Sequence, residues 1–159
     1  MMSDTERFPY HQGIAPMMWA LFALSLIELV VVHIFVALKW PVIGWTLTTI
    51  SALGAIWLVW WIFSLKRLPH ELRDGALTLR LGTLKSVEVA LDNVIAIKST
   101  WEQGAHDDKA SLNLAAIAYP NRCLDLKEPI EKGKARVFIR CDDPASFDLI
   151  MRNHGFAID

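Results

Sequence analysis

Cysteine is scarce in this sequence. Only Cys123 and Cys141 occur in 159 residues, which is too few for the disulfide framework of a small secreted domain. We therefore expect two reduced, half-buried thiols. Net charge is also almost absent, at −1. No global field attracts the chain to nucleic acid, and we expect no nucleic-acid partner.

Catalytic and cofactor motifs are missing as well. The sequence has no nucleophile elbow of the Gly-x-Ser-x-Gly type and no glycine-rich phosphate loop. His106, Asp107 and Asp108 stand together, but no second cluster completes a metal site, and a solvated loop explains them more simply. We expect no enzyme activity, no cofactor and no bound metal. A membrane enzyme or cofactor protein that uses His33 and His11 is an open alternative.

Charge is also rare between residues 14 and 65, where apolar residues dominate. Residues 17–38 contain one Glu and one His, and residues 42–65 contain no charged side chain. As helices these segments would measure about 33 and 36 Å, enough to cross a hydrocarbon layer about 30 Å thick. Helices that stay apolar on every face for roughly six turns are rare in soluble cores. The sequence therefore predicts two transmembrane helices.

A very short turn joins the two segments. Lys39, Trp40 and Pro41 place a charge, an interfacial ring and a helix breaker side by side. The first segment is longer than the apolar region of a signal peptide, which has about 7–15 residues. We expect an antiparallel hairpin over residues 16–65. A tail over residues 1–15 precedes it, and one domain over residues 66–159 follows it.

Positive charge gathers after the second segment. The positive-inside rule weighs Lys and Arg near the ends of the spans. The turn offers only Lys39, and acidic neighbours offset Arg7 in the tail. The rule therefore predicts that both termini are cytoplasmic. The residues that favour this orientation are Lys66, Arg67, His70 and Arg73.

Glu28 lies in the middle of the first predicted span, and His33 follows five residues later. Ionisable residues at this depth are costly and usually face protein or a water-filled cavity. At 3.6 residues per turn the two side chains point about 140° apart, so they do not form a pair on one helix face. Three interpretations are open. Both residues contact a second copy or another membrane protein, or both belong to a path for protons, a metal or a substrate. In the third interpretation, Glu28 is protonated and hydrogen-bonds to a hydroxyl group of the second helix, which Ser51, Thr48 or Thr49 supplies.

The second predicted helix carries small side chains three or four residues apart, which allow another helix to approach closely. They serve either packing within the hairpin or a contact between copies of the chain. These residues are Gly44, Thr48, Ser51 and Ala55.

Residues 66–159 are balanced in charge, with 14 Lys and Arg against 14 Asp and Glu, and their pattern is mainly that of β-strands. Asp74 and Gly75 predict a tight hairpin turn, and residues 76–81 alternate apolar and polar side chains. Residues 112–118 fit a strand or a short helix equally well. Further strands are expected near residues 87–89, 94–97, 121–127 and 135–141, with a polar loop over residues 101–110.

The period changes at the C-terminal end, where a helix is expected over residues 144–154. Asp143 suits the N-cap, Pro144 suits the first helical position, and Gly155 can supply a left-handed stop. The predicted fold class is thus an α-helical membrane hairpin followed by a mainly antiparallel β domain with a C-terminal helix.

Residues 72–82 and 90–97 resemble the opening hairpin and the third-strand region of bacterial pleckstrin-homology-like (PH-like) domains. The resemblance extends over residues 17–159, because membrane forms of this family often place two helices before the domain. It implies a PH-like domain closed by a helix, in a family of unknown function, with the hairpin in a bacterial inner membrane. Members that bind phosphoinositides use basic clusters in their first loops. Here Lys85 stands nearly alone, so recognition of lipid headgroups is not expected.

These features favour a membrane-anchored, non-enzymatic scaffold or interaction module that presents its domain at the inner face of the membrane. The expected partners are the lipid bilayer and either a second copy of the chain or another membrane protein. The alternative is a small subunit of an oligomeric transport or ion-coupling complex that uses Glu28 and His33.

Overall fold

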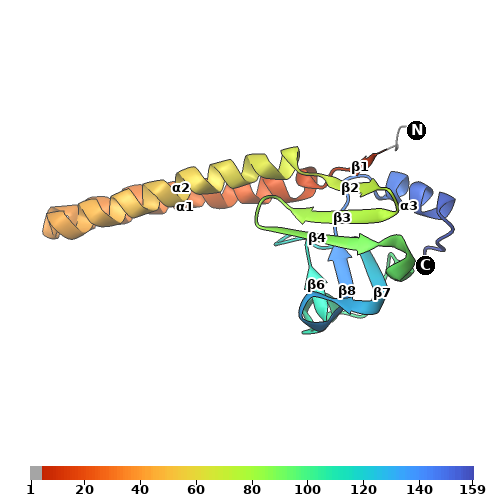
Figure 1. Cartoon of the computed structure of the whole chain (residues 1–159). Coiled ribbons are helices and arrows are strands. Elements are labelled where there is room, and N and C mark those ends of the chain that lie inside the picture. The colour runs from red at the N-terminus through yellow and green to blue at the C-terminus, as the bar shows by residue number, and fades with distance from the viewer. Residues whose placement is uncertain (1–4) are drawn as a thin grey trace.

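The protein has a long helical hairpin attached to a β domain (Figure 1). In a computed structural model, which describes residues 5–159, α1 (His11–Lys39) and α2 (Pro41–Arg67) run side by side away from the domain. Both helices are long and apolar enough to cross a membrane, and the most apolar stretch of each is almost entirely unburied. A core helix of a soluble protein would be covered. The expected layout of two apolar helices, strands and a C-terminal helix is confirmed.

The N-terminal segment is more than the expected tail. β1 (Glu6–Phe8) pairs with a strand of the domain, and α1 begins at His11, six residues before the predicted start of the span. The early start of α1 is explained by a residue far along the chain. The carboxylate of Asp142 accepts hydrogen bonds from the backbone N–H groups of Gln12 and Gly13, at 3.0 and 3.2 Å. It thereby satisfies donors that every helix start leaves free.

The first sheet has the order β1-β2-β3-β4 and is antiparallel throughout. Its other strands are β2 (His70–Arg73), β3 (Ala76–Leu81) and β4 (Lys85–Ala90). The predicted turn between β2 and β3 is confirmed. Asp74 and Gly75 have φ of 50° and 77°, as the two-residue hairpin turn requires.

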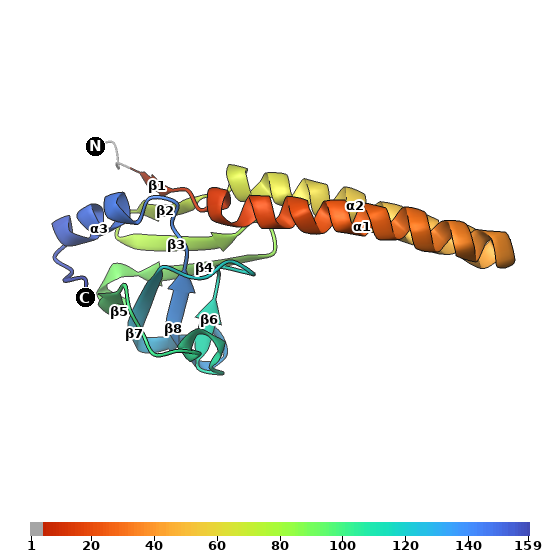
Figure 2. The same cartoon turned by 180° about the vertical axis from the view of Figure 1, so that it is seen from behind.

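The second sheet has the order β5-β7-β8-β6. It consists of β5 (Val94–Lys98), β6 (Ser111–Asn113), β7 (Arg122–Ile130) and β8 (Lys134–Ile139), with β6 parallel to β8 and the other pairs antiparallel. Residues 112–118, for which strand and helix were both open, thus begin in a short strand and continue as a loop. Figure 2 shows this second sheet from behind, beside the first.

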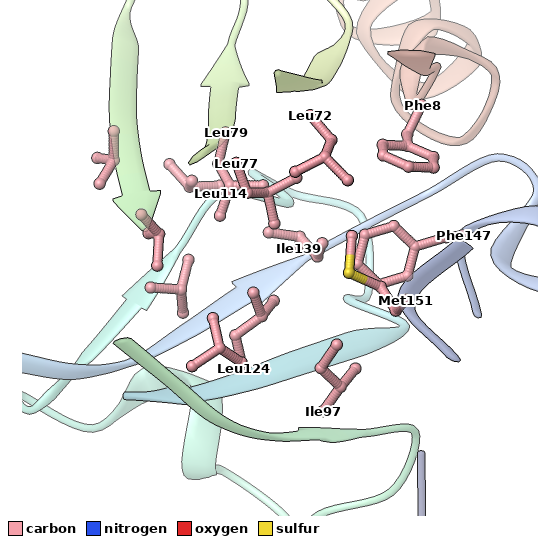
Figure 3. Packing of buried hydrophobic residues seen from close by; sticks show 14 of the residues in the cluster. Phe8, Leu72, Leu77, Leu79, Ile97, Leu114, Leu124, Ile139, Phe147 and Met151 are labelled. Carbon is pink, nitrogen blue, oxygen red and sulfur yellow. The ribbon is translucent and has the colours of Figure 1, made fainter. Parts of the chain in front are cut away.

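The domain core lies between the two sheets and under α3 (Pro144–Asn153). Leu77 and Leu79 of the first sheet pack with Leu124 and Ile139 of the second in one buried cluster, which Figure 3 shows from close by. Phe147 of α3 belongs to the same cluster. The predicted cap of α3 is confirmed, because Asp143 accepts a hydrogen bond from the N–H of Ser146 at 3.1 Å. The helix ends at Asn153, one residue before the predicted end.

Candidate functional site

His33 lies between the two helices of the hairpin. One ring nitrogen, Nδ1, is 2.8 Å from the carbonyl oxygen of Leu29, one turn earlier on α1. The other, Nε2, is 3.4 Å from the hydroxyl oxygen of Ser51 on α2. The imidazole therefore bridges α1 and α2 through polar contacts in the half of the hairpin that lies farther from the domain.

Glu28 lies at the rim of a groove between the two helices. The groove has a volume of about 270 Å³, and Glu28, His33 and Ser51 all contribute to its lining. Both predicted residues thus reach one groove, although no ion pair joins them within residues 5–159. The three hydroxyls that were candidates for Glu28 are engaged elsewhere: Ser51 with His33, and Thr48 and Thr49 with backbone carbonyls of their own helix.

The small residues of α2 divide between two roles. Gly44 serves the hairpin itself, because a side chain there would meet the backbone of Ala37 within 2.5 Å. Gly54 and Ala55 line the groove beside Glu28 instead, and nothing lies within 4 Å of the position that a Cβ at Gly54 would occupy. The α2 side of the groove is therefore lined mostly by small residues, which leave room for another helix to approach, and a carboxyl group lies at its rim.

A joint site of His11 and His33 does not form. His11 opens α1 next to Asp142, at 3.6 Å, whereas His33 lies 22 residues further along the same helix, about 33 Å away by helical rise. In the part of the chain that the structure describes, no three metal-binding side chains come together. His106 packs edge-on against the ring of Tyr119, with 5.3 Å between ring centroids, which anchors the polar loop that carries it.

Sequence reasoning missed a buried polar cluster where the hairpin meets the domain. Tyr10 and His70 are fully buried and their rings stack, with 4.4 Å between centroids. The Tyr10 hydroxyl accepts a hydrogen bond from the N–H of Gly82 at 2.6 Å, and Nδ1 of His70 accepts one from the N–H of Arg80 at 3.0 Å. Burial lowers the pKa of His70 to about 4 and raises that of Tyr10, so both side chains are neutral near pH 7.

Apolar packing surrounds this cluster. The side chains come from the start of α1, the end of α2 and the loop between β6 and β7. We call this set the junction; it consists of Tyr10, Ile14, Met18, Trp61, Ile62, Leu65 and Ala118. Arg140 closes one side of it, because its guanidinium fills the space next to Gly13 and donates to the carbonyl of Tyr119 at 2.8 Å.

A second hollow, of about 370 Å³, lies on the outer face of the second sheet, with Trp101 among its lining residues. Its charges largely neutralise one another. Asp125 accepts contacts from Lys98 at 2.5 Å and from Arg136 at 3.5 Å. Cys123 also lines the hollow, but burial raises the pKa of its thiol to about 12. A thiol in that state is a poor nucleophile, and the hollow offers no strong charge to a ligand.

Comparison with known proteins gives no relative: no family model, no curated protein and no solved structure matches the chain.

Proposed function

We propose that the chain is a membrane-anchored, non-enzymatic interaction module, whose hairpin crosses a bacterial inner membrane and whose PH-like domain is held at the cytoplasmic face. The exposed apolar surface of α1 and α2 supports the membrane location. Lys66 and Arg67, which are exposed in the last turn of α2, support the orientation. Two sheets closed by a C-terminal helix support the PH-like assignment.

The junction is the observation that carries this proposal. Only two residues separate β1 from α1, and only two separate α2 from β2. The domain is therefore attached to the hairpin by two short connections and packs against the base of the hairpin. Freely tethered domains use long polar linkers. A module built in this way holds its binding surfaces at a fixed height and rotation above the bilayer.

The partner in the membrane is a second copy of the chain, seated at the groove that Glu28 rims. A carboxyl group in the middle of a bilayer costs about 3 kcal/mol on insertion scales, and the hydroxyls nearby are already engaged. Two copies related by a two-fold axis along the membrane normal would bring two Glu28 side chains together. One protonated carboxyl then donates to the other, and the small residues of the groove permit the approach.

Energy transfer between donor-labelled and acceptor-labelled copies in lipid vesicles tests this association. Glu28→Gln should preserve the transfer, because an amide still donates and accepts hydrogen bonds. Glu28→Leu should weaken the dimer by about 1 kcal/mol, or roughly five-fold in dissociation constant. The matched control is Val30→Leu, which changes an exposed apolar residue whose side chain points about 160° away from Glu28 on the same helix. Unchanged transfer in Glu28→Leu would rule this contact out.

The same variants distinguish the proposed interaction module from a subunit of a transport or ion-coupling complex. A proton-carrying Glu28 needs its carboxyl group, so Glu28→Gln would abolish a proton flux while the oligomer persisted. The groove that Glu28 and His33 both line is the observation that keeps this second function open. A proton flux into vesicles that Glu28→Gln removes would favour the transport subunit over the module.

A further inference from the structure

We propose that the domain also touches the bilayer directly, through two loops that flank the base of the hairpin. The loops are the β3–β4 turn, with Leu84, and the loop between β6 and β7, with Ile117 and Tyr119. We call these three side chains the lipid-facing surface. The inference rests on the proposed membrane location of the hairpin, and it adds the headgroup region of the bilayer as the occupant of this surface.

The β3–β4 turn is fixed against α2. Its Gly82 N–H donates to the Tyr10 hydroxyl at 2.6 Å, and its Thr83 N–H donates to the hydroxyl of Ser64 at 3.2 Å. A Cβ at Gly82 would lie 2.5 Å from that same hydroxyl and 2.9 Å from the indole nitrogen of Trp61. The turn therefore has a defined height along the hairpin, level with residues 61–64, and Figure 1 shows it beside the base of the helices.

That height corresponds to the edge of the bilayer. Ser64 lies 23 residues after Pro41, which begins α2 at the far end of the hairpin. At 1.5 Å per residue this distance is about 35 Å, slightly more than a hydrocarbon core of about 30 Å. The turn next to Ser64 is thus placed among the headgroups, where apolar and aromatic side chains are favourable.

The second loop reaches the same level. Its Ala118 is buried in the junction with Trp61 and Met18, and the carbonyl of Tyr119 accepts a hydrogen bond from Arg140 at 2.8 Å. Ile117 and Tyr119 stand on either side of that buried alanine, at 48% and 60% exposure, and one side of the Tyr119 ring packs against Trp101 and His106.

The distribution of exposed apolar side chains supports a lipid occupant. Within residues 68–159 five large apolar side chains are strongly exposed, and three of them form the lipid-facing surface: Leu84, at 53%, Ile117 and Tyr119. The other two, Ile95 and Leu149, stand singly on β5 and α3. Lys66 and Arg67 are exposed at the end of α2, two and three residues after Ser64, which the β3–β4 turn contacts. Apolar tips flanked by cations suit an anionic membrane surface.

Fluorescence of single labels in the full-length protein tests the proposal. Leu84→Cys and Ile117→Cys are each labelled with the polarity-sensitive fluorophore NBD. The protein is then reconstituted into phosphatidylcholine–phosphatidylglycerol vesicles that carry a nitroxide quencher in the upper acyl chain. Leu149→Cys on α3, beyond the far end of the first sheet (Figure 1), is the matched control on the domain. Val31→Cys reports whether the hairpin itself is inserted.

Labels at positions 84 and 117 should show blue-shifted emission and quenching by the lipid nitroxide, whereas the label at 149 should show neither. A blue shift without lipid quenching would mean that protein covers the surface, and it would overturn the proposal. So would unquenched labels at 84 and 117 beside a quenched label at 31, and the membrane location would then survive alone. An unquenched label at 31 would remove the membrane location and this inference together.

Discussion

The hydroxyl of Tyr10 accepts a hydrogen bond of 2.6 Å from the backbone N–H of Gly82, a residue 72 positions later in the chain. Both groups are buried, and the tyrosine ring stacks on His70 at the same time. One side chain thus ties the segment before α1 to the turn between β3 and β4. The geometry of the hairpin relative to the domain depends on this contact.

Tyr10→Phe keeps the ring and its stacking but removes the acceptor, so the N–H of Gly82 is left buried without a partner. Such a loss costs about 1–3 kcal/mol. We expect the free energy of unfolding in mild detergent to fall by that amount, measured by chemical denaturation. Tyr119→Phe, at an exposed tyrosine, is the control and should change stability little. Equal effects of the two variants would contradict the role given to Tyr10.

Gly82→Ala should be more damaging than Tyr10→Phe. Gly82 has φ of +52°, and an added Cβ would collide with the hydroxyl of Ser64 and the indole of Trp61. Gly75→Ala provides the matched control, because Gly75 also has positive φ but nothing lies within 4 Å of its Cβ position. The control isolates the backbone strain, about 1–2 kcal/mol.

If the β3–β4 turn fixes the domain, Gly82→Ala should lower the melting temperature further than Gly75→Ala. It should also make the two connections between hairpin and domain susceptible to protease. Similar melting temperatures and similar protease resistance would show that the turn does not depend on close packing against α2.

Local signals in the sequence were sufficient for much of the fold. The missing charge in residues 42–65 predicted α2, the Asp74-Gly75 pair predicted the first β-hairpin, and Asp143 followed by Pro144 predicted the start of α3. Each of these signals acts over a few residues, because helix caps, tight turns and apolar runs depend on neighbours in the chain.

The junction depends on contacts across long stretches of chain, and for that reason the sequence did not reveal it. Asp142 follows the last strand and immediately precedes Asp143, the cap of α3, and nothing in its neighbours points to α1. Its carboxylate binds the start of α1, 129 and 130 residues earlier. Glu28 and His33 were singled out only because they are ionisable residues within an apolar segment. That both reach one groove follows from the crossing of α1 and α2, which a helical period cannot predict.

His70 should make the stability of the junction depend on pH. Burial lowers the pKa of its imidazole from 6.5 to about 4, so the unfolded chain binds a proton at a higher pH than the folded one does. The contribution of the neutral His70 side chain to the free energy of unfolding is complete above pH 6.5 and is lost as the pH falls toward 4. The difference between the pKa values of His70 in the unfolded and folded chain corresponds to a loss of about 3 kcal/mol in the free energy of unfolding.

His70→Phe removes this titration, although it also removes the acceptor for the N–H of Arg80. We therefore expect the variant to be less stable at pH 7, and the difference from the wild type to shrink between pH 6.5 and pH 4. Unfolding free energies measured across that range check the slope. His154→Gln, at an exposed histidine, should leave the slope unchanged, and parallel curves for the wild type and His70→Phe would exclude His70 as its source.

Cys123 and Cys141 should be inert in the folded protein. Both were expected to be half-buried thiols, and both are fully buried and free within the described residues. Burial raises the pKa of each thiol to about 12, so at pH 8 only about one thiol in ten thousand is the reactive thiolate. Neither cysteine should react with Ellman's reagent in mild detergent, and both should react after denaturation. Leu149→Cys adds an exposed thiol to the same background and should contribute one rapid equivalent. Rapid labelling of the wild type that Cys123→Ser removes would mean that the outer face of the second sheet opens in solution and exposes Cys123.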